Sequence, residues 1–181
     1  MEDGLTVEAI FTPGHSDDHT SFFIREEKAL ISGDLILGAP STSVNDLDAY
    51  MKSLYKLRQF PIEWVLLPHS VSLDSPSFIM VEGPPKIEAY IAYREKQMLK
   101  ILESFAPQPG ESNEAAFLPR SQAQLYEVIY GARNLSDGLK LAAFANLYQQ
   151  TEKLRNDGLL AYDEETELFT RVVAPPKKPN L

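Results

Sequence analysis

The sequence of 181 residues contains no cysteine and only three histidines. Without cysteine the chain forms no disulfide, no thiolate metal site and no cysteine nucleophile, and such a composition fits a reducing compartment. A catalytic zinc ion usually takes three protein ligands. Three histidines are therefore too few for the chain to fill two zinc sites of the usual kind by itself.

The sequence also lacks long apolar runs and a surplus of positive charge. No run approaches the roughly 18 residues that span a bilayer, and the acidic start of the chain is unlike a signal peptide. We expect no membrane segment; the compartment stays open, and an intracellular location, cytoplasmic or mitochondrial, is favoured. Lys and Arg number 17 against 26 Asp and Glu, which gives a net charge of −9. This charge repels phosphate backbones, so nucleic-acid binding would need a local basic patch.

The remaining composition, 44% hydrophobic and 24% charged, is typical of a globular protein. The candidate functional residues at the start of the chain gather in one stretch, residues 11–37. A predicted strand over 7–11 runs into a Pro-Gly turn that delivers His15, and the chain then reverses through a strand over 21–24. It returns as a strand over 29–32, which ends on Asp34. Two strands that end at one sheet edge and each present a ligand can build a metal site, since imidazole suits zinc and a carboxylate can bridge two ions.

Apolar spacing predicts a helix over about 46–59 with Asn45 as its N-cap. A short apolar run then precedes Pro68-His69-Ser70, which makes His69 a third candidate ligand at a strand end. The other elements expected in this half are a strand over 64–67, a loop over 70–84 and a helix over 85–105.

A linker over 106–118 separates a second, smaller module over 119–173, and residues 174–181 form a tail. Helices over 121–130 and 139–156, with Gly158 after the second, precede a hairpin over 159–173. Helices followed by a two-stranded wing describe a winged helix. Six basic residues stand against eight acidic ones in this module, so we expect it to pack on a partner or shape a substrate groove rather than bind nucleic acid.

The motifs Thr12-Pro13-Gly14-His15-Ser16 and Ser32-Gly33-Asp34 resemble the third and fourth metal motifs of the metallo-β-lactamase superfamily. A second histidine at 19, the apolar run to Gly38 and the helix beginning at Lys86 are similar to one branch, that of the mitochondrial endoribonuclease beta-lactamase-like protein two and related fungal thioesterases. The family signature His-x-His-x-Asp-His is absent. The resemblance thus implies an α+β fold: the C-terminal half of an αββα sandwich over 1–105, followed by the winged helix.

By resemblance, His15 would serve one zinc ion, Asp34 would bridge, and His69 would serve a second zinc ion. The family has glycine on both sides of the histidine in its last motif, whereas His69 has none, which alters the turn. His19, Asp17 and Asp18 are expected to shape the loop or orient His15 rather than bind metal directly. Asp34 also has a simpler explanation, a turn aspartate bonded to its own backbone.

In intact family members two zinc ions share a water that attacks an ester, thioester or phosphodiester. With the signature absent, each ion keeps about two protein ligands, so we expect no hydrolysis by this chain alone. Half a sandwich leaves one sheet face uncovered, which predicts a homo-oligomer or a complementing protein chain over that face. Its candidate residues are Phe11, Phe22, Ile24, Ile31 and Trp64.

Three hypotheses remain: part of a zinc hydrolase, a non-catalytic scaffold or assembly subunit derived from that family, and a free-standing winged-helix regulator. The charge of the second module speaks against the third. The upstream coding sequence would separate the first two, because an in-frame His-x-His-x-Asp-His motif identifies part of an enzyme.

Overall fold

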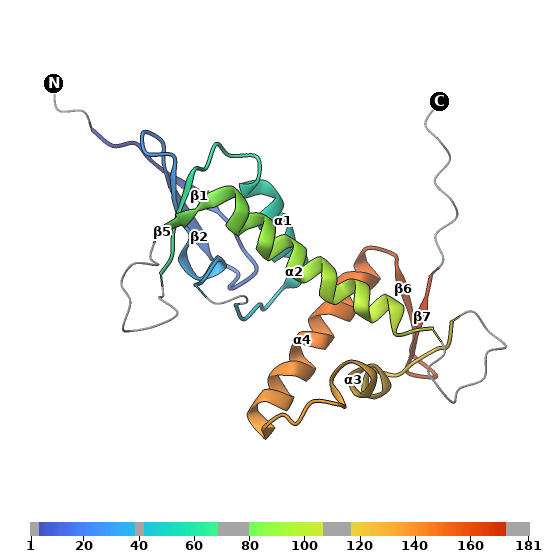
Figure 1. The fold of residues 1–181 in the computed structure, drawn as a ribbon. Helices are drawn as coiled ribbons and strands as arrows, with labels where there is room; N and C mark the ends of the chain where they lie inside the picture. The colour runs from blue at the N-terminus through green and yellow to red at the C-terminus, as the bar shows by residue number, and fades with distance from the viewer. Residues whose placement is uncertain (1–3, 39–41, 69–79, 107–116, 173–181) are drawn as a thin grey trace, which may run out of the picture. The chain divides into compact units, whose positions relative to one another are not determined.

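A computed structural model of the chain describes residues 4–38, 42–68, 80–106 and 117–172 (Figure 1). The chain forms two compact units, residues 1–95 and 96–181. The boundary falls inside helix α2 (Gly83–Glu103), and most of the predicted linker lies outside the described residues. Across the described ranges, none of the helices is long and apolar enough to cross a membrane.

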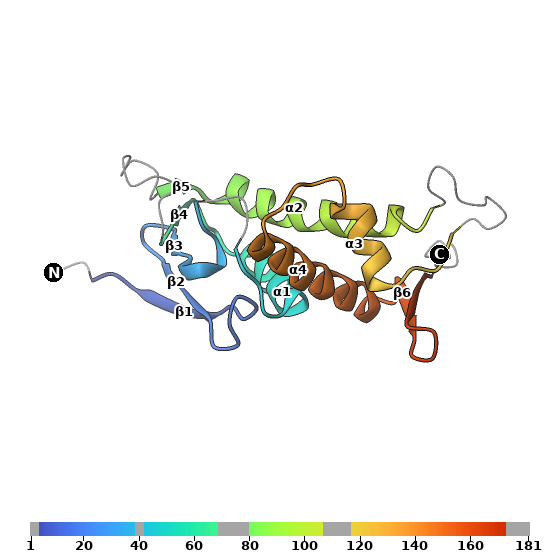
Figure 2. The same cartoon turned by 90° about the horizontal axis from the view of Figure 1, so that it is seen from below.

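The first unit is built on a five-stranded sheet whose spatial order follows the sequence (Figure 2). Its strands are β1 (Val7–Phe11), β2 (Thr20–Ile24), β3 (Ala29–Ile31), β4 (Trp64–Leu66) and β5 (Met80–Glu82). Only β3 and β4 pair in parallel. A parallel pair needs a crossover, which here contains the short turn η1 (Gly33–Leu35) and helix α1 (Leu47–Leu57).

Side chains alternate along the strands, so the sheet has two distinct faces. One face lies in the core of the unit, where Ile10, Phe23, Leu30 and Val65 are at most 4% exposed. Helix α1 adds its apolar stripe to this core, as the spacing of its buried residues requires. The first turn of α2 and the centre of that helix contribute Ile87, Tyr90 and Ile91.

The other face carries large apolar side chains that are open to solvent. Their strand register places them together, because Phe22 pairs with Ala9 on one side and with Ile31 on the other. We call this set the open sheet face: Val7, Phe11, Phe22, Ile31, Trp64 and Met80, which are 39–56% exposed. The predicted exposure of Phe11, Phe22, Ile31 and Trp64 is confirmed, whereas Ile24 is half-buried.

Two predictions for this unit are wrong. Asp46, not Asn45, is the N-cap of α1, since the Asp46 carboxylate accepts a hydrogen bond from Ala49 N at 2.9 Å. The backbone of Asn45 is committed elsewhere, donating to Gly14 O at 2.8 Å. Part of the predicted loop over 70–84 is strand β5, which is too short for its alternation to be recognised in the sequence. His69 lies outside the described residues.

The second unit contains the end of α2, helices α3 (Gln122–Tyr130) and α4 (Asp137–Asn156), and the hairpin of β6 (Leu160–Asp163) and β7 (Leu168–Arg171). A reciprocal capping box of Ser121 and Gln124 begins α3. After α4, Gly158 adopts a φ of +71°, as predicted for a residue that ends a helix. The predicted helices and hairpin are confirmed, and the name winged helix remains a prediction.

Neighbouring phenylalanines on β2 test the assignment of the two faces. We predict that Phe23→Ala lowers the free energy of unfolding by about 3–5 kcal/mol, because Phe23 is 4% exposed and its loss leaves a cavity. Phe22→Ala, on the open sheet face, changes it by less than about 1 kcal/mol. Urea unfolding of both variants measures the difference, and equal losses would contradict the faces described here.

Candidate functional site

His15 is presented by a turn whose backbone lies directly on helix α1. Gly14 has a φ of +131°, and a Cβ at this position would lie 2.3 Å from the Cα of Tyr50. Gly14 O accepts hydrogen bonds from the backbone at the start of α1, and Ser53 Oγ donates to Pro13 O at 2.8 Å. Only glycine fits this approach, which explains the Pro-Gly pair before His15.

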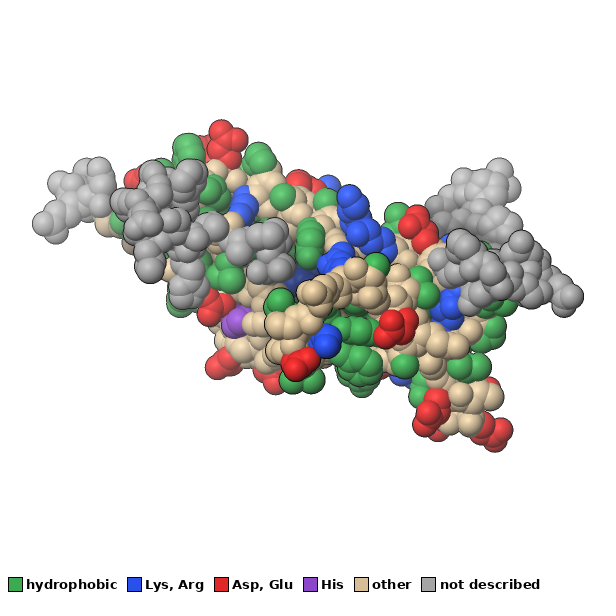
Figure 3. All heavy atoms as spheres, turned by 60° about the horizontal axis from the view of Figure 1, so that its bottom comes forward, with side chains coloured by type: hydrophobic (Ala, Val, Ile, Leu, Met, Phe, Trp, Pro, Cys, Tyr) green, Lys and Arg blue, Asp and Glu red, His purple; other side chains and the backbone are tan. Residues whose placement is uncertain are grey.

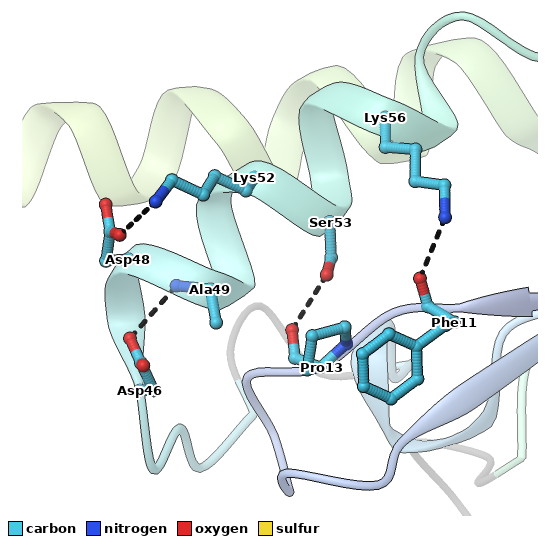
Figure 4. Close-up of a pocket in the computed structure, with 8 residues that line it drawn as sticks. All are labelled: Phe11, Pro13, Asp46, Asp48, Ala49, Lys52, Ser53 and Lys56. Atoms are coloured by element: carbon cyan, nitrogen blue, oxygen red, sulfur yellow. Dashed lines mark hydrogen bonds and ion pairs between the residues drawn. The ribbon is translucent and has the colours of Figure 1, made fainter.

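An open pocket of about 320 Å³ runs along the same contact (Figure 4). On its helix side, Lys52 pairs with Asp48 and Lys56 donates to Phe11 O at 3.1 Å. The ring of Phe11 forms the sheet side and is 56% exposed. The pocket thus reaches from α1 to the edge of the open sheet face.

The ring of His15 is oriented by the segment that precedes α1. His15 Nδ1 lies 2.9 Å from Ser43 O and 3.3 Å from Thr42 Oγ1. A carbonyl oxygen can only accept, so the proton of this hydrogen bond is on Nδ1. Nε2 lies 3.6 Å from Asp34 Oδ2. A histidine held in this way by a backbone carbonyl is oriented as a metal ligand commonly is.

Asp34 reaches His15 from the turn η1, directly after β3. Gly33 has a φ of +53°, and a Cβ there would lie 2.7 Å from His19 Nε2. On the other side of Asp34, the hydroxyl of Tyr50 donates to Leu35 O at 2.7 Å. A tight turn on one side and an anchored carbonyl on the other thus place the carboxylate.

His19 lies beside the pair formed by His15 and Asp34. Its ring is 6.0 Å from that of His15, centroid to centroid, and nearly perpendicular to it. His19 Nδ1 lies 3.0 Å from Thr12 O, which fixes the ring to the start of the turn. Burial lowers the pKa of His19 below its ordinary value of 6.5, although the Thr12 carbonyl acts in the opposite direction.

Asp17 and Asp18 are exposed in the same turn. Ser16 Oγ donates to Asp18 Oδ1 at 2.8 Å, and this hydrogen bond lowers the pKa of the Asp18 carboxyl. Asp18 therefore shapes the turn. The structure brings together His15, Asp34 and His19, while His69 lies outside the described residues.

The pair of His15 and Asp34 fits two corners of a zinc site. Two ligand atoms about 2.0–2.1 Å from a tetrahedral ion lie about 3.3 Å from each other, close to the observed 3.6 Å. Among the described ranges, no group of three or more His, Cys, Asp or Glu is arranged so that it could hold a metal ion. The side chains of His15 and Asp34 are 25% and 42% exposed, so the pair is accessible. Figure 3 shows a histidine at the surface beside acidic side chains. The described residues thus supply half of a tetrahedral set.

The residues that position His15 and Asp34 were not identified from the sequence. Thr42 and Ser43 orient His15, and the guanidinium of Arg94 donates to Thr42 O at 2.7 Å. Tyr50 lies in the predicted helix over 46–59, whose apolar spacing indicates burial but not the hydrogen bond to Leu35 O. The available signal was the spacing of Lys86, Tyr90 and Arg94, which places three hydrogen-bonding side chains on one face of α2.

The lowered pKa of His19 predicts a pH dependence of stability. Between its pKa in the folded chain and about 6.5 the unfolded chain binds more protons, so the free energy of unfolding rises with pH in this window. The contribution is complete above pH 6.5 and is lost as the pH falls. We expect His19→Gln to flatten this slope in urea unfolding between pH 5 and 8, and Asp17→Asn to leave it unchanged; identical slopes in both variants would contradict the assignment.

Comparison with known proteins agrees with this geometry. The family model of the metallo-beta-lactamase superfamily matches residues 1–69. An atrochrysone carboxyl ACP thioesterase of Aspergillus fumigatus is 35% identical over 132 residues, which cover 71% of this chain and 39% of that protein. A beta-lactamase-like protein 2 homolog of Caenorhabditis elegans is 38% identical over 104 residues, covering 56% of this chain and 33% of its own length.

The lactamase-like protein adaB of Aspergillus niger is 28% identical over 179 residues, or 96% of this chain and 54% of that protein. The chain thus spans between a third and about half of the length of these relatives.

Two solved structures share the fold. A beta-lactamase domain protein from Burkholderia ambifaria has a TM-score of 0.73 and 19% identity, over 93% of this chain and 49% of its own. A metallo-beta-lactamase family protein from Thermus thermophilus has a TM-score of 0.64 and 18% identity, over 95% of this chain and 53% of its own. With the His15 turn and the Asp34 turn at one edge of the sheet, the chain belongs to the metallo-β-lactamase superfamily and covers part of the length of its members.

Proposed function

We propose that this chain supplies part of the zinc centre of a hydrolase that cleaves thioesters. The observation that carries the proposal is the 3.6 Å approach of His15 Nε2 to Asp34 Oδ2, with His15 Nδ1 engaged by a carbonyl. A thioester is favoured over a nucleic-acid phosphodiester because the net charge of −9 repels a polyanion. A relative named as an acyl-carrier thioesterase supports the same choice.

In this proposal His15 holds one ion through Nε2, Asp34 bridges, and His69 serves the second ion on the strength of the sequence alone. Bound zinc would supply a water of lowered pKa, and hence a hydroxide nucleophile near neutral pH. The carbonyl of Ser43 keeps the proton on His15 Nδ1. Thr12 holds the His19 ring against the same edge of the sheet.

In this proposal His15, His69 and the shared carboxylate of Asp34 give each ion about two ligands, fewer than a catalytic zinc ion usually takes. The open sheet face supports a proposal for the source of the rest. Aromatic side chains bury roughly 150–250 Å² each and aliphatic ones somewhat less, so six half-exposed side chains present about 500–600 Å². That is the upper end of what a monomeric protein exposes in one patch, and such patches mark interfaces.

We therefore propose that a complementing polypeptide with an apolar β-sheet covers this face and brings the missing ligands to the edge that carries His15 and Asp34. The scaffold hypothesis uses the same face without catalysis. The absence of glycine on both sides of His69 supports the scaffold hypothesis. Zinc binding distinguishes it from the hydrolase hypothesis.

Zinc affinity of the purified chain tests the proposal. We expect weak binding, measured by competition with a chromophoric chelator, because the chain offers about two ligands per ion. His15→Ala and Asp34→Asn each lower the affinity at least about tenfold. The matched control is Asp48→Asn, which removes a half-buried carboxylate paired with Lys52 on α1 and should bind zinc as the parent chain does.

The parent chain should not hydrolyse an acyl thioester in the presence of zinc. Zinc-dependent turnover that His15→Ala abolishes would contradict the incomplete site. Equal zinc affinity in His15→Ala, Asp34→Asn and Asp48→Asn would contradict the ligand assignment and favour the scaffold.

For the second unit we propose packing against protein rather than nucleic acid. On α4 the basic side chains Lys153 and Arg155 are paired with Asp157 and Glu152. The turn between β6 and β7 is acidic, with Asp163 Oδ1 accepting backbone hydrogen bonds. The helix also exposes apolar side chains: Leu139, Leu141, Phe144 and Tyr148.

Fluorescence anisotropy with labelled single-stranded RNA and duplex DNA checks this prediction. We expect no saturable binding below about 10 μM at 150 mM salt, since non-specific binding depends on neutralising phosphates with Lys and Arg. Sub-micromolar binding that weakens steeply with salt would contradict it.

A further inference from the structure

Three side chains of helix α2, spaced four residues apart, bind the backbone after Asp34 at Leu37, Gly38 and Thr42. Lys86 Nζ lies 3.3 Å from Gly38 O. The Tyr90 hydroxyl lies 2.9 Å from both the N and the O of Leu37. Arg94 donates to Thr42 O at 2.7 Å. Side chains with this spacing share one face of a helix, so the backbone of residues 37, 38 and 42 is held along two turns of α2.

Arg94 is the most buried of the three, at 2% exposure. Arginine is almost never buried unless its charge is held by a partner. Here its guanidinium lies 5.3 Å from the centre of the Tyr50 ring. The Tyr50 hydroxyl in turn donates to Leu35 O, the residue after Asp34. One buried cation is thus connected to the turn that carries the carboxylate.

The same cation is connected to His15. Thr42, whose carbonyl Arg94 binds, is 7% exposed and places its hydroxyl 3.3 Å from His15 Nδ1. The next carbonyl, Ser43 O, lies 2.9 Å from that nitrogen and sets its proton there. A shift of residues 42–43 would remove the acceptor and allow the proton to move to Nε2, the atom that faces Asp34.

We propose that Arg94 is a positioning residue. By holding Thr42 O and the Tyr50 ring at once, it fixes the tautomer of His15 and keeps His15 and Asp34 facing each other. The value of this role for zinc rests on the proposed function, while its effect on the tautomer does not. A purely structural Arg94 would support the fold and leave the proton of His15 where it is.

Long-range ¹H–¹⁵N NMR on metal-free protein with labelled histidine reads the tautomer directly, and only three histidines contribute. In the parent chain we expect the His15 proton on Nδ1. In Arg94→Met, which keeps an unbranched apolar stem, we expect a mixture of tautomers at His15. His19, held by Thr12, serves as an internal control and should not change.

The matched control is Arg58→Met, which removes an exposed arginine paired with Glu88 on α2. It should leave both histidines as in the parent chain. A proton on His15 Nε2 in the parent chain, or a single Nδ1 tautomer retained in Arg94→Met, would overturn the proposal. If Arg94→Met does not fold, Arg94→Lys is read in its place, because lysine offers a point charge instead of a planar fork; an unchanged His15 in that folded variant also overturns it.

Zinc competition is the second readout. We expect Arg94→Met to weaken zinc binding about tenfold, the usual cost of losing a residue that orients a ligand. A changed tautomer in a chain whose parent form binds no zinc would support the positioning role and contradict the proposed function. Zinc binding that depends on His15 and is identical in Arg94→Met and Arg58→Met would support the proposed function and contradict the positioning role of Arg94.

Discussion

The contact on which the first unit depends is that between Gly14 and helix α1. A Cβ on Gly14 would lie 2.3 Å from the Cα of Tyr50, so the backbone of the turn and the helix meet without a side chain between them. Tyr50 also donates to Leu35 O and lies beneath the guanidinium of Arg94. One helical residue therefore sets the positions of the His15 turn, the Asp34 turn and α2. The strands end at one edge of the sheet, and the contact between Gly14 and α1 determines which side chains lie at that edge.

Strands β1 to β4 and all four helices could be predicted from the sequence, because apolar alternation and helical spacing are local signals. The N-cap of α1 could not be. Asn45 and Asp46 are both good caps, and Gly14 O accepts the backbone N–H groups of both, so only the hydrogen bond from Ala49 N to the Asp46 carboxylate distinguishes them. Strand β5 directly precedes Gly83 and Pro84, residues typical of a loop, and its pairing with β4 is a tertiary contact.

The sequence pointed to His15 and Asp34, which the structure brings together, but not to the residues that position them. His15 and Asp34 stand next to glycines at strand ends, a pattern visible in the sequence. Arg94 acts on Thr42, 52 residues earlier, and no local pattern links the two. Tyr50 shows the same limit, since helical spacing indicates that it is buried but not that its hydroxyl binds Leu35 O. Local turns place His15 and Asp34, whereas tertiary contacts orient them.

Strand β2 presents a large apolar side chain to each face of the sheet. Phe22, on the open sheet face, pairs with Ala9 and Ile31, and Phe23, on the core face, pairs with Leu30 and Glu8. A strand that is apolar on both sides is typical of a sheet covered on both sides. Helices cover one face here, and the other ends at the edge where His15 and Asp34 meet. A second layer on that face would end at the same edge, so under the proposed function one added layer would both cover the exposed apolar surface and complete the candidate zinc site.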